Sequence, residues 1–180
     1  MSDPVLSLDT FTYQDYKTWP EDFRCELIDG VVCMMASPLL WHQQMVLKLG
    51  TQLAEFFEGK PCQPFIAPVD VRLFPQDDES DDDVVQPDLI VVCDEKKLAD
   101  GKACKGAPDL VIEVLSSSTR HYDLVTKLEK YRKAGVREYW IIGNDAVRVI
   151  VFDPYQVREW DLKKSREVKS VIFPALVLRF

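Results

Sequence analysis

Residues 108–116, "PDLVIEVLS", pose the central question of this 180-residue sequence. Their apolar side chains predict a strand buried on both faces of a sheet, yet Glu113 places a carboxylate in its middle. An ionised carboxylate is costly to bury unless a cation, a hydrogen-bond network or a metal ion compensates its charge. We therefore expect a partner for Glu113 elsewhere in the fold.

The composition predicts one globular domain over residues 1–180. A chain of 180 residues with 47% hydrophobic composition can bury one core and is short for two. No apolar run reaches the roughly 20 residues that span a bilayer, and the N-terminus lacks the pattern of a signal peptide. We expect a cytoplasmic protein.

Charge and cysteine content argue against several classes of protein. A net charge of -8 disfavours a protein that coats nucleic acid nonspecifically, because clustered Lys and Arg supply that affinity. Six acidic residues lie within residues 77–83, which we interpret as a solvated loop. The five cysteines form no CxxC pair, so they predict free thiols and neither a zinc site nor a disulfide framework.

Periodicity and turn residues predict an α/β (α+β) fold, with a mixed, mostly antiparallel central sheet flanked by helices. Asp29-Gly30 between two β-type runs indicates a hairpin over residues 24–36. One helix is expected over residues 39–58, and a second over 119–134 from a Ser/Thr cap to Gly135. The inward stripe of the first helix is expected to contain His42, Val46, Leu49, Leu53 and Phe56. The other strands are expected at residues 64–74, 84–93, 137–142, 146–153 and 157–162, with an edge strand near Pro174.

Chain order suggests a partner for Glu113. If residues 84–93 and 108–116 form antiparallel neighbours, Asp88 lies beside Glu113, whereas Asp109 lies at the other end, near Cys93. Two adjacent carboxylates repel unless a cation lies between them. A divalent ion such as Mg²⁺ is commonly held by one or two carboxylates together with water and phosphate oxygens.

The second helix adds a lysine to these acids. Lys127 borders an apolar helical stripe and can lean toward the sheet. Two carboxylates, a metal ion and a lysine suit phosphodiester hydrolysis. The alternative is a buried ion pair of Glu113 and Lys127 without chemistry. His42 is either a core histidine or a group at the site, and Glu26 is either an exposed hairpin residue or a further carboxylate there.

Several motifs together resemble a known family. They are "ELIDG" at 26–30, "SP" before the helix that carries His42, "QPDLIVV" at 86–92, "PDLVIEVLS", and "DLVTKLEKYRKAGVREYWII" at 123–142. They resemble restriction-endonuclease-like bacterial proteins within the PD-(D/E)xK nuclease superfamily. The resemblance covers about residues 10–160 and is most specific over 108–142.

The resemblance implies a restriction-endonuclease-like fold and a deoxyribonuclease that uses Mg²⁺ or Mn²⁺. It implies that Asp88 and Glu113 are the motif acids and metal ligands. The lysine expected two residues after the acid is replaced by Leu115, and the resemblance moves its role to Lys127. It also implies that Glu26 and His42 line the same cleft. Asp70 matches as well, and we interpret it as structural.

A different class of function is the alternative: a catalytically silent module that reuses the nuclease fold to bind a protein or nucleic-acid partner. The acidic net charge favours this module, whereas the set of Asp88, Glu113 and Lys127 favours the enzyme with DNA as substrate. A homodimer is expected in either case, because nuclease domains that cut duplex DNA often act in pairs.

Overall fold

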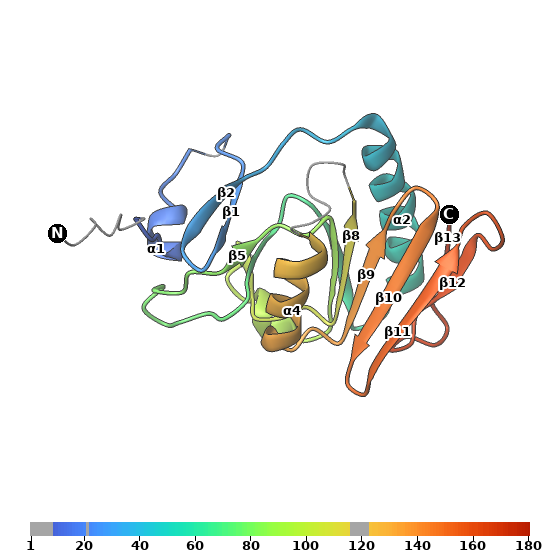
Figure 1. Ribbon diagram of the computed structural model, residues 1–180. Coiled ribbons are helices and arrows are strands. Elements are labelled where there is room, and N and C mark those ends of the chain that lie inside the picture. The colour runs from blue at the N-terminus through green and yellow to red at the C-terminus, as the bar shows by residue number, and fades with distance from the viewer. Residues whose placement is uncertain (1–8, 21, 116–122) are drawn as a thin grey trace.

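A six-stranded sheet forms the centre of the molecule (Figure 1). The computed structural model describes residues 9–20, 22–115 and 123–180. The central sheet contains β3 (Gln63–Ile66), β6 (Leu89–Val92), β8 (Leu110–Val114), β9 (Glu138–Ile142), β10 (Ala146–Phe152) and β11 (Tyr155–Asp161). Its strand order is β11-β10-β9-β8-β6-β3, and within this sheet only β8 and β9 are parallel neighbours. The predicted mixed, mostly antiparallel sheet is confirmed.

Helices and a second sheet accompany the central sheet. The helices are α1 (Tyr13–Tyr16), α2 (Leu40–Phe57) and α4 (Leu128–Ala134), with a 3₁₀ turn η1 (Glu95–Leu98) and a π-helical turn η2 (Asp123–Lys127). The second sheet, of order β2-β1-β5-β4-β7, contains β1 (Cys25–Ile28), β2 (Val31–Met34), β4 (Asp70–Arg72), β5 (Val84–Val85) and β7 (Ala103–Lys105). The sequence patterns predict its hairpin but not its assembly into a separate sheet.

The two faces of the central sheet are buried by different partners. Leu110 and Ile112 of β8 belong to the apolar core beneath α2, whereas Val111 belongs to the core shared with α4 and the second sheet. Side chains alternate along a strand, so Glu113 projects on the same face as Val111, toward α4. The two-sided burial predicted for this stretch is confirmed, and α4 lies where a partner for Glu113 is needed.

Local turn and helix signals account for the hairpin and for α2. Asp29 and Gly30 have positive φ angles of 51° and 72°, as the tight turn of a two-residue hairpin requires. The predicted helix is α2, although its last buried residue is Phe57 and not Phe56, because the buried position lies four residues after Leu53. A Cβ atom at Gly50 would lie 3.3 Å from the side chain of Leu89, so this glycine permits close packing of α2 on β6.

The interpretation of residues 77–83 as a solvated loop is wrong for two of its acids. Asp81 is 4% exposed and accepts hydrogen bonds from the buried guanidinium of Arg72. Asp83 is 3% exposed and lies 2.8 Å from the ammonium of Lys130. These ion pairs attach the loop to the second sheet and to α4, which a count of charges along the chain does not predict.

The prediction of five free thiols is also wrong. Cys62 and Cys93 form a disulfide, and Cys25, Cys33 and Cys104 are free. Strands β3 and β6 are antiparallel with Gln63 opposite Val92, so the next residues outward, the two cysteines, face each other. A spacing of 31 residues along the chain conceals this neighbourhood.

The ends of two predicted elements differ from expectation. The helix expected at 119–134 is described from Asp123 onward, and its predicted Ser/Thr cap lies outside the described residues; Gly135 ends it with a φ of 93°. The C-terminal residues add no edge to the central sheet. They form a separate pair, β12 (Glu167–Lys169) with β13 (Val177–Arg179).

None of the helices in the described ranges is long and apolar enough to cross a membrane.

Candidate active site

Two acids meet at one end of the central sheet. Leu89 pairs with Ile112 in the antiparallel register of β6 and β8, so the next residues outward, Asp88 and Glu113, face each other. The backbone N–H of Asp88 lies 3.4 Å from Oε2 of Glu113. At the opposite end, Asp109 Oδ2 accepts a hydrogen bond of 2.8 Å from the backbone N–H of Cys93. The pairing predicted from chain order is confirmed.

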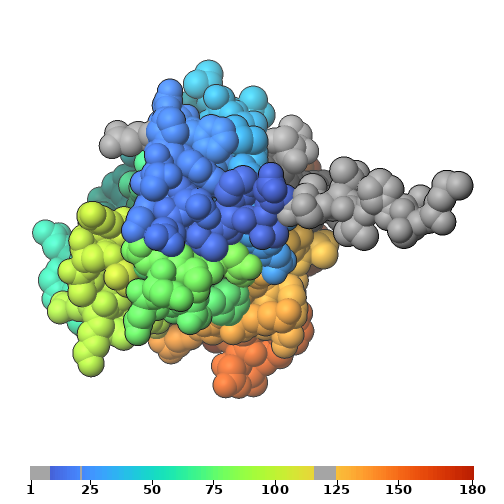
Figure 2. All heavy atoms as spheres, turned by 90° about the vertical axis from the view of Figure 1, so that its left-hand side faces the viewer, coloured from blue at the N-terminus to red at the C-terminus, as the bar shows by residue number. Residues whose placement is uncertain are grey.

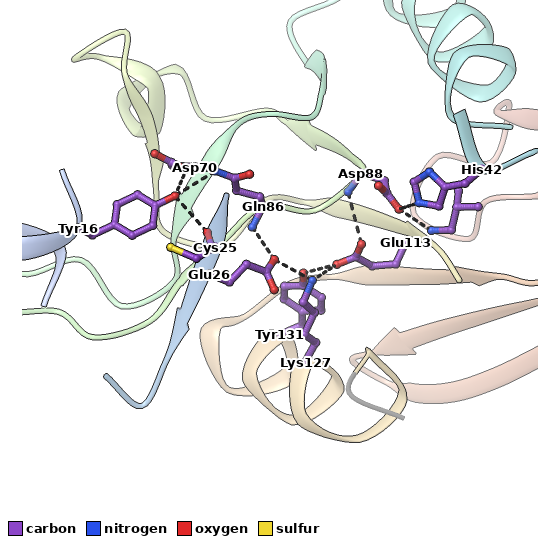
Figure 3. Close-up of polar contacts among 11 residues, drawn as sticks. Tyr16, Cys25, Glu26, His42, Asp70, Gln86, Asp88, Glu113, Lys127 and Tyr131 are labelled. Atoms are coloured by element: carbon purple, nitrogen blue, oxygen red, sulfur yellow. Dashed lines mark hydrogen bonds and ion pairs between the residues drawn. The ribbon is translucent and has the colours of Figure 1, made fainter. Parts of the chain in front are cut away.

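Lys127 lies between two buried glutamates (Figure 3). Its Nζ is 2.9 Å from Oε1 of Glu113 and 2.8 Å from Oε1 of Glu26. All three residues are 4% exposed. Glu26 is therefore not an exposed hairpin residue. One ammonium from the end of η2 joins a strand of each sheet, and it is the partner that Glu113 requires.

Tyr131 is a second partner of Glu113. Its hydroxyl donates a hydrogen bond of 2.8 Å to the same oxygen, Oε1. Burial, together with the negative charge of Glu113, raises the pKa of Tyr131, so the hydroxyl remains a proton donor. Sequence reasoning missed this role of Tyr131, which lies one turn after Lys127. The shared spacing of four residues was the available signal.

His42 contacts Asp88, the second acid of the pair. It lies in the first turn of α2, is 8% exposed, and places Nε2 3.1 Å from Oδ2 of Asp88. The same oxygen accepts a hydrogen bond of 2.8 Å from the backbone N–H of Val114. His42 is thus both a buried helix residue and a contact of Asp88, which combines the two interpretations considered for it.

Gln86 connects this site to a neighbouring group of polar residues. Its backbone N–H donates to Oε1 of Glu26 at 2.8 Å, and its side-chain amide donates to Oδ1 of Asp70 at 2.9 Å. Asp70 also accepts from the hydroxyl of Tyr16 and lies on the far side of Gln86 from Glu113 (Figure 3). Sequence reasoning missed Gln86, whose only signal was its position two residues before Asp88.

A cavity of about 640 Å³ brings the five predicted site residues together. It is lined in part by Glu26, His42, Asp88, Glu113 and Lys127. Three of these are acids and one is a lysine, and Arg24 adds a second cation to the cavity wall. In the part of the chain that the structure describes, there is no group of three or more His, Cys, Asp or Glu side chains that could together hold a metal ion.

Known proteins are similar to this chain in fold and, at lower identity, in sequence. A solved structure described as "a putative nuclease belonging to DUF820" from Anabaena variabilis matches with a TM-score of 0.75 and 19% identity, covering 94% of each chain. Two Synechocystis sp. proteins, "Uncharacterized protein sll1609" and "Uncharacterized protein slr1290", are 27% and 24% identical. The first match covers 76% of each chain, and the second covers 82% of this chain and 76% of the relative. Residues 13–179 match the family model "Uma2: Putative restriction endonuclease". The chain therefore belongs to the Uma2 family of restriction-endonuclease-like proteins.

Proposed function

We propose that the protein is a metal-dependent deoxyribonuclease that hydrolyses phosphodiester bonds in the 640 Å³ cavity. The observation that carries this proposal is the position of Lys127. Its ammonium is held by Glu26 and Glu113 in the wall of the cavity that also contains Asp88 and His42. A lysine displaced from its usual motif position thus reaches the acid that the motif requires.

Asp88 and Glu113 fit as ligands of Mg²⁺ or Mn²⁺. Both offer carboxylate oxygens, which these hard ions prefer, and the two residues face each other across one pair of strands. Oδ1 of Asp88 receives no hydrogen bond from the described residues, whereas Oδ2 is held by His42 and Val114. Mg²⁺ is often bound by one or two carboxylates with waters and substrate phosphate completing its shell, so two protein ligands suffice.

The residues of the chain have distinct parts in the proposed reaction. A bound divalent ion would polarise the phosphoryl group and lower the pKa of an attacking water. Lys127 would orient that water or neutralise charge that develops on the phosphoryl oxygens. Tyr131 keeps Glu113 in place, and Glu26 keeps Lys127 in place. His42 orients Asp88.

Cleavage assays with purified protein test the proposal. Linear duplex, circular and single-stranded DNA are incubated in Mg²⁺, in Mn²⁺ and in EDTA. We expect metal-dependent cleavage that falls by about 100-fold or more in Asp88→Asn and Glu113→Gln, the order of loss typical of groups that stabilise a transition state. Glu129→Gln is the matched control, because Glu129 lies on α4 with a side chain that is 48% exposed.

Calorimetric titration with Mn²⁺ supplies a readout besides activity. Wild type should bind Mn²⁺, and Asp88→Asn should bind it more weakly while unfolding at the same urea concentration. Wild-type cleavage no greater than the background seen in EDTA, together with equal Mn²⁺ binding by wild type and both acid variants, would contradict the proposal. That result would favour the silent interaction module, in which Lys127 is only part of a buried ion pair.

A further inference from the structure

A second cavity, of about 390 Å³, adjoins the first. The two cavities share three lining residues, Arg24, Pro68 and Gln86. Its volume lies within the roughly 300–1,000 Å³ of small-ligand sites. Figure 2 shows the face of the molecule on which the N-terminal segment, in blue, meets the green and yellow-green segments that also contribute to this cavity. A ligand in one cavity could therefore extend into the other.

Aromatic rings form one part of the wall of the second cavity. Tyr16, Trp19 and Phe23 all line it. The rings of Trp19 and Phe23 are 5.5 Å apart at 88°, and those of Tyr16 and Trp19 are 5.5 Å apart at 55°. Phe23 nevertheless remains 41% exposed. Partly exposed rings in a cavity are the feature by which proteins stack the bases of single-stranded nucleic acids.

Cations form another part of the same wall. Arg24, Lys17 and Lys102 line the cavity and are exposed. Lys17 pairs with Glu79, whereas Arg24 and Lys102 form no ion pair with any described residue. On a chain with a net charge of -8, three cations line this cavity beside a single acid, Asp70, so positive side chains outnumber negative ones in its wall. Cations interleaved with aromatic rings suit a ligand that carries both phosphates and flat bases.

Hydrogen bonds join this cavity to the candidate active site (Figure 3). The hydroxyl of Tyr16 and the side-chain amide of Gln86 both donate to Oδ1 of Asp70, at 2.9 Å. Burial and the charge of Asp70 raise the pKa of Tyr16, so the hydroxyl stays protonated. Because the backbone of Gln86 also holds Glu26, one residue maintains the relative positions of the two cavities.

We infer that the second cavity binds an unpaired nucleobase of a DNA strand whose backbone enters the first cavity. This inference rests on the proposed function and narrows its substrate to single strands, or to duplexes with an unpaired nucleotide. A duplex hides the faces of its bases inside the stack, so only an unpaired base can lie against Trp19 and Phe23. Arg24, which lines both cavities, would contact the phosphate between them.

Binding measured without metal tests the inference independently of cleavage. Fluorescence anisotropy compares a labelled single strand with the duplex of the same sequence, both in EDTA, where metal-dependent hydrolysis cannot proceed. Wild type should bind the single strand more tightly. Phe23→Leu should weaken single-strand binding by about 5- to 150-fold, which is the loss of affinity expected when one base loses its aromatic stacking partner. Duplex binding should remain unchanged. Phe23→Trp should retain the affinity.

Two controls separate stacking and charge from general damage. Tyr155→Leu removes an aromatic side chain that is 64% exposed on β11 and should not change binding. Arg24→Gln should reduce the dependence of log affinity on log salt by about 0.7, one phosphate contact to a single strand. Urea unfolding of each variant establishes that the fold is retained.

The outcomes distinguish this inference from the proposed hydrolysis. Duplex binding as tight as single-strand binding, or unchanged single-strand affinity of Phe23→Leu, would overturn the base pocket even if the protein cuts DNA. Single-strand binding that depends on Phe23, without cleavage in Mg²⁺ or Mn²⁺, would support the pocket and contradict the hydrolysis.

Discussion

Replacing Lys127 with methionine removes the ammonium that Glu26 and Glu113 share and keeps an unbranched apolar side chain. At 2.8 and 2.9 Å, each ion pair has a Coulomb energy of about 6 kcal/mol at an effective dielectric constant of about 20. Desolvation of the buried charges offsets much of this attraction, and loss of one partner of a buried pair costs about 3–5 kcal/mol. We expect the free energy of unfolding of Lys127→Met to fall by that amount at neutral pH.

The loss should be smaller in acid. In the variant, Glu26 and Glu113 lie close together without their shared cation, and protonation of one removes the repulsion. Unfolded glutamates take up protons only near about pH 4.3, so the folded variant binds a proton at a higher pH than its unfolded chain. Stability is then retained at low pH and lost as the pH rises through the folded-state titration.

Urea unfolding at about pH 5 and about pH 7.5, followed by tryptophan fluorescence, measures both effects. Lys133→Met is the matched control, because the side chain of Lys133 is 60% exposed and its ion pair with Glu129 is longer, at 3.5 Å. Its unfolding free energy should change by no more than about 0.5 kcal/mol. A loss below about 1 kcal/mol for Lys127→Met at both pH values would refute the reasoning, since this is a typical effect of any substitution.

Further predictions concern the fold. Arg72→Met should lower the free energy of unfolding by about 3–5 kcal/mol, because it leaves the carboxylate of Asp81 buried without its partner; an unchanged urea midpoint would contradict this. Reduction of the disulfide between Cys62 and Cys93, 31 residues apart, should cost about 3.7 kcal/mol in the loop-entropy model. Thiol titration of unreduced, denatured protein should then find three thiols, and five would disprove the bond. Gly135→Ala should cost about 1–2 kcal/mol by forcing a side chain into a left-handed conformation, which a thermal melt can detect.

The positions of Asp88 and Glu113 could be predicted from the sequence, because both lie on strands that are neighbours in the chain. An antiparallel connection brings the start of the first strand beside the end of the second, and alternation then decides which side chains share a face. The same reasoning predicted that Asp109 lies beside Cys93 at the opposite end. Such predictions need only the direction and the period of a strand.

The partners of these acids depend on packing between distant elements. Glu26 reaches Lys127 only because the second sheet packs over the same face of the central sheet as α4. Gln86 and Tyr131 were missed for the same reason, since their roles lie in hydrogen bonds to residues on other elements.

The sequence by itself determined the hairpin at Asp29-Gly30, the helix that carries His42, the buried strand around Glu113 and the antiparallel approach of Asp88. Each follows from local backbone preference or from the periodic spacing of apolar side chains, and both can be read from residues that are close together in the sequence. Only the tertiary structure decided that one ammonium serves two glutamates, that two acids of a charged loop are buried, and that Cys62 meets Cys93. These contacts depend on the distances between packed elements, and those distances are set by the complementary shapes of the whole core.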